Sequence, residues 1–129
     1  MVPSSPFILV IESSATLRAV IDVTFHQYPY PVGWAIYEEA VSALRDIQAS
    51  LLPIPDVALI RLELPRLDGI AATRLMRTRG YATSIVLLLE QPSTLDQLHA
   101  RLAGANATLA KPFTVQSLLQ TLSSFSSLG

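Results

Sequence analysis

Runs of consecutive apolar residues alternate along this chain with stretches in which apolar residues recur every three or four positions. The clearest runs are Phe7–Ile11, Val57–Ile60 and Ser84–Leu89, and Ala107–Ala110 is a shorter one. Continuous apolar runs of this length are typical of strands that are covered on both faces, as in a parallel sheet. A weaker run, Val32–Ile36, contains a glycine and follows two prolines, which favours a strand at the sheet edge.

Helical periodicity fills the segments that follow these runs. The predicted helices are Ala15–His26, Glu38–Ser50, Asp68–Arg79, Thr94–Ala103 and Val115–Phe125. In the fourth of them, Leu95, Leu98 and Leu102 share one face and are expected to point inward. The regular alternation of strand and helix predicts an α/β domain, a doubly wound parallel sheet of five strands with helices on both faces.

Composition supports one domain and excludes several functional classes. The 129 residues fit a single domain, with residues 1–6 and 126–129 expected to be flexible ends. Half of the residues are apolar and the net charge is −1 without a basic block, so neither a nucleic-acid surface nor a polybasic membrane patch is expected. No apolar run approaches the roughly 18 residues of a membrane span. The absence of cysteine excludes disulfides and is typical of a cytoplasmic protein.

The segment from Pro55 to Gly69 is the centre of the functional prediction. It contains a buried strand, then Leu64-Pro65, and then Leu67-Asp68-Gly69 at the start of a helix. In open parallel sheets, ligands and chemistry lie just outside the carboxyl ends of the strands. An arginine, Arg61, stands at that point of this strand.

Four segments, in order and over nearly the whole chain, resemble the receiver domain of bacterial two-component response regulators. They are Ile8–Arg18, Pro55–Gly69, Ser84–Glu90 and Gly104–Phe113, the last of which contains the specific Lys-Pro-Phe motif. The resemblance implies a flavodoxin-like, CheY-like fold with strand order 2-1-3-4-5. It places the site at the switch point between the first and third strands.

The resemblance also implies a set of functional positions, and this chain departs from most of them. In the family, an aspartate at the end of the third strand accepts a phosphoryl group, and two acids after the first strand help to hold Mg²⁺. Here the acceptor position is Arg61, which has no nucleophilic oxygen and stays protonated. The acid pair becomes Glu12 and Ser13. The hydroxyl that the family has at the end of the fourth strand becomes Leu89.

Among the remaining functional positions that the resemblance implies, one carries the residue type of the family. Lys111, the sole lysine of the chain, stands where the family has its lysine, whereas the aromatic switch position is Thr108. Glu63 falls where the family supplies a backbone carbonyl to the metal, so its side chain is expected to be exposed. Because a guanidinium occupies the region of the cation, Mg²⁺ binding is expected to be weak or absent and no cofactor is expected.

Two alternatives stay open for each of the cations at this site. Arg61 either pairs with Glu12 across neighbouring strands and replaces the metal, or it reaches solvent. Lys111 either remains a phosphate sensor or is held by Glu12 or Glu63, which we favour. The resemblance implies a cis peptide bond before Pro112.

These features predict a pseudo-receiver that signals through protein–protein contact without aspartyl phosphorylation. The expected partner is another signalling protein or an attached output domain, with a homodimer as a further option. In the family, such contacts use the face formed by the fourth helix, fifth strand and fifth helix, here about Thr94 to Phe125. The polar residues expected on that face are Asp96, Gln97, Arg101, Asn106, Gln116 and Gln120.

The second hypothesis is a working input domain that is phosphorylated at another residue or controlled by a small ligand. The nearby aspartates are Asp56, at the wrong end of its strand, and Asp68, which is expected to start a helix. An independent enzyme built on Glu12 and Lys111 has too few converging groups, so the chain is not expected to be an enzyme.

Overall fold

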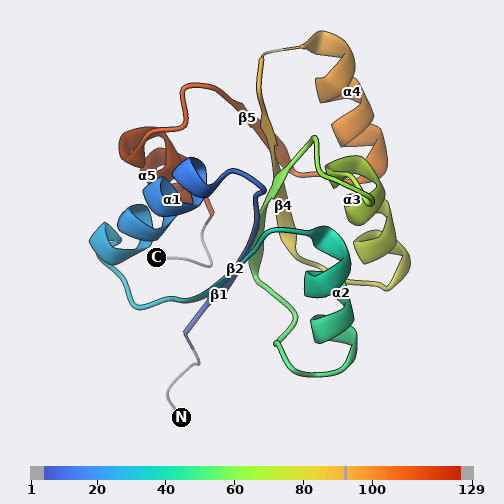
Figure 1. The fold of residues 1–129 in the computed structure, drawn as a ribbon, viewed down its shortest axis with the longest axis horizontal. Coiled ribbons are helices and arrows are strands. Elements are labelled where there is room, and N and C mark those ends of the chain that lie inside the picture. The colour runs from blue at the N-terminus through green and yellow to red at the C-terminus, as the bar shows by residue number, and fades with distance from the viewer. Residues whose placement is uncertain (1–4, 92, 126–129) are drawn as a thin grey trace.

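The computed structural model describes residues 5–91 and 93–125, which form a three-layer α/β domain (Figure 1). The strands are β1 (Phe7–Ile11), β2 (Gly33–Tyr37), β3 (Val57–Arg61), β4 (Ser84–Leu89) and β5 (Ala107–Ala110). The helices are α1 (Ala15–Gln27), α2 (Ala40–Gln48), α3 (Gly69–Thr78), α4 (Thr94–Ala103) and α5 (Val115–Ser123). The sheet is parallel with order β2-β1-β3-β4-β5, which confirms the prediction.

The two faces of the sheet are covered by different helices. Successive strand residues point to opposite faces, so Ile8 packs with α1 and α5, whereas its neighbour Leu9 packs with α2 and α3. Figure 1 shows α1 and α5 on one side of the sheet and α2, α3 and α4 on the other. Because both faces are buried, the central strands are continuously apolar rather than alternating.

The inward prediction for the leucines of α4 is wrong. Leu95, Leu98 and Leu102 are 59%, 50% and 73% exposed, and the residues that α4 buries are Ala100 and Ala103. Two stripes with helical spacing compete on this helix, one of leucines and one that contains the alanines. The small side chains let α4 pack closely against the domain, which leaves the leucine stripe facing outward.

The termini differ slightly from the prediction. Residues 1–4 and 126–129 of the expected flexible ends lie outside the described residues. Pro6, also assigned to the flexible start, accepts a backbone hydrogen bond from Gly33 at 2.9 Å. The ordered sheet edge therefore includes Pro6. Three helices, α2, α3 and α5, are shorter than predicted.

Candidate functional site

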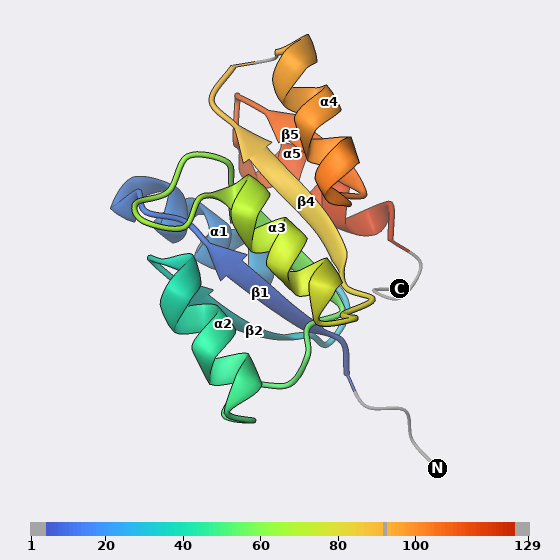
Figure 2. The same ribbon diagram turned by 90° about the vertical axis from the view of Figure 1, so that its right-hand side faces the viewer.

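Four charged side chains meet where the carboxyl ends of the strands come together. Figure 2 shows that β1 and β4 run in the same direction and end at the same edge of the sheet. Glu12 follows β1, Arg61 ends β3, Glu90 follows β4 and Lys111 follows β5. The topology thus brings together residues that are up to a hundred positions apart in the sequence.

Arg61 is the centre of this cluster, and its side chain is only 15% exposed. Its Nη1 lies 3.6 Å from Glu12 Oε2, and its Nη2 donates a hydrogen bond to Glu90 Oε2. Its guanidinium carbon also lies 5.7 Å from the centre of the Phe113 ring, within cation–π range. The expected ion pair with Glu12 is present, but the hydrogen-bonded partner is Glu90.

Glu12 is a completely buried carboxylate. Its Oε1 accepts a hydrogen bond from the backbone N–H of Ser14 at 2.9 Å. Within the described part of the chain, its Oε2 has no hydrogen-bond partner and faces the guanidinium of Arg61. An unpaired buried charge is costly, so Arg61 supplies the compensating charge at close range.

Glu90 bridges the two cations. Its Oε2 accepts from Arg61 and its Oε1 pairs with Lys111 Nζ. These contacts lower the pKa of Glu90, chiefly through the hydrogen bond from Lys111 and also through the positive charge of Arg61. The Glu90 carboxylate is therefore ionised at neutral pH.

The predicted partners of Lys111, Glu12 or Glu63, are wrong, and strand register explains the observed one. Leu89 of β4 lies opposite Ala110 of β5, so the next residue of each strand, Glu90 and Lys111, falls side by side. Aligning the two strands in the sequence could have revealed this pairing. The bond between Lys111 and Pro112 is cis, as the resemblance implied.

Other predicted site residues lie outside the charged cluster. Leu89 is 1% exposed and belongs to the core, and Ser13 is exposed, with its carbonyl accepting from Arg18 at 2.9 Å. Thr108 is partly buried on β5 and borders a hollow beside α4. Glu63 is exposed, as expected.

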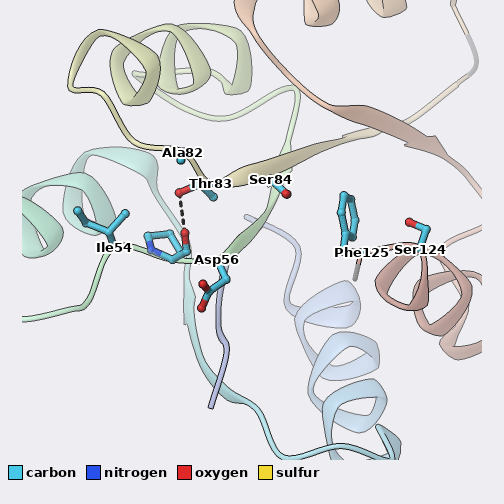
Figure 3. Close-up of a pocket in the computed structure, with 8 residues that line it drawn as sticks. Ile54, Asp56, Ala82, Thr83, Ser84, Ser124 and Phe125 are labelled. Carbon is cyan, nitrogen blue, oxygen red and sulfur yellow. Dashed lines mark hydrogen bonds between the residues drawn. The ribbon is translucent and has the colours of Figure 1, made fainter. Parts of the chain in front are cut away.

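The two nearby aspartates have structural roles. Asp68 caps α3, because its Oδ1 accepts a hydrogen bond from the backbone N–H of Ala71 at 2.8 Å, as expected. Asp56 lies at the opposite edge of the sheet, where it lines the hollow shown in Figure 3 and accepts from the backbone N–H of Phe7 at 2.7 Å. In the same hollow the Thr83 hydroxyl donates to the Pro55 carbonyl at 2.7 Å. The side chains of Asp68, Asp56 and Thr83 therefore all take part in hydrogen bonds to the backbone.

The fold agrees with the family that the sequence matches. Residues 8–123 match the response regulator receiver domain family. The chain belongs to this family. Receivers are in general signalling modules of two-component systems rather than enzymes, and they interact with kinases and output domains.

Individual relatives of this receiver are distant. The transcriptional regulatory protein PhoP of Escherichia coli K12 is 30% identical over 112 residues, which cover 87% of the receiver and 48% of PhoP. PdtaR of Mycobacterium tuberculosis is 28% identical over 89% of the receiver and 54% of PdtaR. The receiver thus spans about half the length of these curated relatives.

Solved structures match over nearly the whole receiver. CheY4 of Vibrio cholerae superposes with a TM-score of 0.80 at 24% identity and covers 94% of the receiver and 98% of CheY4. The Mn²⁺-bound form of Rcp1 has a TM-score of 0.78 at 18% identity, with 90% and 88% coverage. These likenesses show the fold.

The described residues contain neither a candidate membrane span nor a candidate metal cluster. Within residues 5–91 and 93–125, no helix of the receiver has the length and apolar character needed to cross a membrane. Across the same ranges, no cluster of three or more His, Cys, Asp or Glu residues could hold a metal ion.

Proposed function

We propose that this receiver is a pseudo-receiver, a signalling module that acts through protein–protein contact without aspartyl phosphorylation. The observation that carries the proposal is the guanidinium of Arg61 at the acceptor position, enclosed by Glu12, Glu90 and the ring of Phe113. Such a module would work in the cytoplasm beside other phosphorelay proteins and would catalyse no reaction of its own.

The chemistry of phosphoryl transfer supports this proposal. Transfer to an amino-acid side chain needs a nucleophile, which in this family is a carboxylate oxygen, together with donors or cations that stabilise the charge on the phosphoryl oxygens. Arg61 offers no nucleophile, Leu89 has no hydroxyl group to donate, and Lys111 is engaged by Glu90. The positions that would act on a phosphoryl group are therefore replaced or already paired.

The oxygen donors at the site do not fit Mg²⁺, so we propose that the receiver binds this ion weakly or not at all. Mg²⁺ requires near-octahedral oxygen coordination and usually one or two free carboxylates. Glu12 gives one oxygen to a backbone N–H and faces Arg61 with the other. A divalent cation would have to approach a guanidinium that already neutralises this carboxylate.

We further propose that the receiver pairs with a second copy of itself through the face formed by α4, β5 and α5. Leu95, Leu98 and Leu102 form an exposed apolar stripe there. The same helix carries Asp96 near its start and Arg101 near its end. A two-fold pairing with antiparallel α4 helices would place each acid against the other copy's arginine, so the face is self-complementary.

An intact-mass measurement after treatment with Mg²⁺ and acetyl phosphate tests the central claim. The wild-type receiver is expected to gain no phosphoryl group. The variant Ser13→Asp/Arg61→Asp/Leu89→Thr, which restores the family's oxygen donors, is expected to gain one.

A phosphorylated wild-type receiver would overturn the proposal. Repeating the treatment with Asp56→Asn and Asp68→Asn would then show whether one of these aspartates is the acceptor, which is the second hypothesis.

A further inference from the structure

A cleft of about 410 Å³ opens beside the charged cluster, between the first turns of α1 and the connection from β5 to α5. Its lining residues are Ser14, Thr16, Leu17, Val20, Arg61, Glu90, Lys111, Pro112 and Phe113. The volume lies in the range of small-molecule sites. The cleft is therefore large enough for a small organic molecule and not only for an ion.

The cleft is amphipathic. Apolar side chains from α1 and from the segment after Lys111 form most of its wall, namely Leu17, Val20, Pro112 and Phe113. Arg61 and Lys111 place two cations at one end, with the carboxylate of Glu90 between them and paired with both. A ligand that satisfied both parts would need a charged or polar head and an apolar body.

Hydrogen-bond donors outnumber acceptors at the charged end. Arg61 carries five N–H donors and Lys111 three. Among the described residues, the Arg61 side chain makes one hydrogen bond, to Glu90, and one longer ion pair, to Glu12. The Lys111 ammonium makes one contact, also to Glu90. Spare donors on two cations favour a head group made of anionic oxygen atoms.

The start of α1 adds to this preference. Ser14 caps the helix and lines the cleft together with Thr16, and the first turn of α1 contains no acidic residue. The N-terminal end of a helix carries partial positive charge and favours anions. The helix end and the two side chains therefore attract negative charge to the same cleft.

We propose that this cleft binds a small organic carboxylate with an aromatic or branched aliphatic body. The carboxylate would take donors of Lys111 and Arg61 in competition with Glu90, and the body would lie against Val20 and Phe113. The side chain of Glu90 is 38% exposed, so water can solvate it once it is displaced. Binding of this kind does not depend on whether the receiver is phosphorylated.

Displacement of Glu90 would link the cleft to α4. Glu90 begins the connection that leads to Ser93, the N-cap of α4. Its contacts to Arg61 and Lys111 tie that connection to β3 and β5. A bound carboxylate would therefore break the contacts that Glu90 makes to Arg61 and Lys111.

A titration of ¹⁵N-labelled receiver with 2-naphthoate, followed by amide chemical shifts, tests the proposal. Saturable shifts are expected at the cleft residues around Thr16 and Phe113. Neutral 2-naphthamide keeps the body without the charge, and inorganic phosphate keeps the charge without the body. Both are expected to bind at least about tenfold more weakly, since a charge-assisted hydrogen bond or a buried apolar ring each changes affinity by about that factor or more.

Three variants separate the contributions. Lys111→Gln is expected to weaken 2-naphthoate binding by about tenfold. Glu90→Gln is expected to strengthen it, because the competing carboxylate is gone. Arg74→Gln removes an exposed positive charge on α3, away from the cleft, and is expected to leave the affinity unchanged.

Several results would overturn the proposal. Absence of cleft shifts at millimolar 2-naphthoate would do so, as would shifts confined to the leucines of α4. If the neutral amide or phosphate alone bound as tightly as 2-naphthoate, an amphipathic carboxylate would be excluded as the preferred ligand. An unchanged affinity in Lys111→Gln would exclude the assigned head-group contact.

Discussion

Arg61 balances the charge of a carboxylate that water cannot reach. Glu12 is completely buried, and its Oε2 has no hydrogen-bond partner among the described residues and lies 3.6 Å from Nη1 of this guanidinium. The guanidinium is itself held from its other side by Glu90 and covered by the ring of Phe113. Its role in the domain is therefore structural.

Replacing Arg61 by methionine should destabilise the receiver strongly. The change leaves the buried carboxylate of Glu12 without its counter-charge, which costs about 3 kcal/mol. Arg74→Met removes an exposed arginine and should change the free energy of unfolding by less than about 0.5 kcal/mol. Urea denaturation measures both.

The double variant Glu12→Gln/Arg61→Met shows whether the lost counter-charge is the cause. With a neutral side chain at position 12, most of the stability lost in Arg61→Met should return. Equal stability of Arg61→Met and Arg74→Met would show that the charge of Arg61 does not stabilise the buried carboxylate of Glu12.

Glu90 should make stability depend on pH in the acid range. Its pKa is lowered below the ordinary value of 4.5 by Lys111 and Arg61, so folding favours the ionised form. The stabilisation is complete above the ordinary value and is lost as the pH falls through the lowered pKa. Wild type should therefore exceed Glu90→Gln in stability at neutral pH, and the gap should narrow as the pH falls below 4.5.

Urea denaturation of the two proteins between neutral pH and pH 3 measures this difference. Glu63→Gln is the matched control, since Glu63 is exposed and makes no ion pair with any residue the structure describes. A constant gap between wild type and Glu90→Gln across this range would contradict the assigned ion pairs.

At the scale of elements, the connection from β3 to α3 depends on a glycine at a close approach. A Cβ atom on Gly69 would lie 2.5 Å from the carbonyl oxygen of Arg61 and 2.9 Å from the Cα atom of Leu62. The backbone N–H of Gly69 also donates to the Leu62 carbonyl at 2.8 Å. The first turn of α3 thus packs directly on the backbone of the acceptor position.

Gly69→Ala should therefore destabilise the receiver by about 1–3 kcal/mol, because the added methyl group forces the backbone to shift. Alanine normally favours the helix more than glycine does. A gain in stability in Gly69→Ala would therefore show that the backbone accommodates the added methyl group without strain. Gly33→Ala is the control, since a Cβ atom there has its nearest contact at 3.5 Å, an ordinary distance. Thermal unfolding of both variants gives the comparison.

The sequence predicted the strands better than it predicted which helix faces are buried. Fully buried strands are continuous apolar runs, so β1 was placed at its observed bounds, Phe7–Ile11. The face of α4 was assigned wrongly because leucine is more hydrophobic than alanine, whereas close packing required Ala100 inside. Glu90 was missed as the bridging residue because its role depends on the register of β4 and β5, which local pattern does not give.

At the scale of the whole molecule, most of the large exposed apolar side chains of the described residues lie in two groups, and Val23, Tyr30 and Val41 are exposed singly. Leu95, Leu98 and Leu102 line α4, whereas Leu51 and Ile54 lie on the connection between α2 and β3. The α4 stripe also has Asp96 and Arg101 beside it. Opposite charges beside an apolar stripe favour pairing with a second copy, so we expect self-association at α4.

Removing the α4 leucines should weaken self-association without unfolding the monomer. In Leu98→Gln/Leu102→Gln, the dimer dissociation constant should rise more than about tenfold, because each central apolar contact contributes about 1 kcal/mol or more. Leu51→Gln is a matched control, since Leu51 and Leu102 are both 73% exposed. Sedimentation equilibrium measures the three proteins.

A charge exchange tests the orientation of the pair. Arg101→Asp alone should weaken the dimer, since two acids of one copy then face two acids of the other. Asp96→Arg/Arg101→Asp exchanges the signs and should restore association, because an antiparallel pairing of α4 helices again sets opposite charges against each other. A wild-type receiver that stays monomeric at high concentration, or a Leu51→Gln variant as weak as the double leucine variant, would exclude this face as the dimer contact.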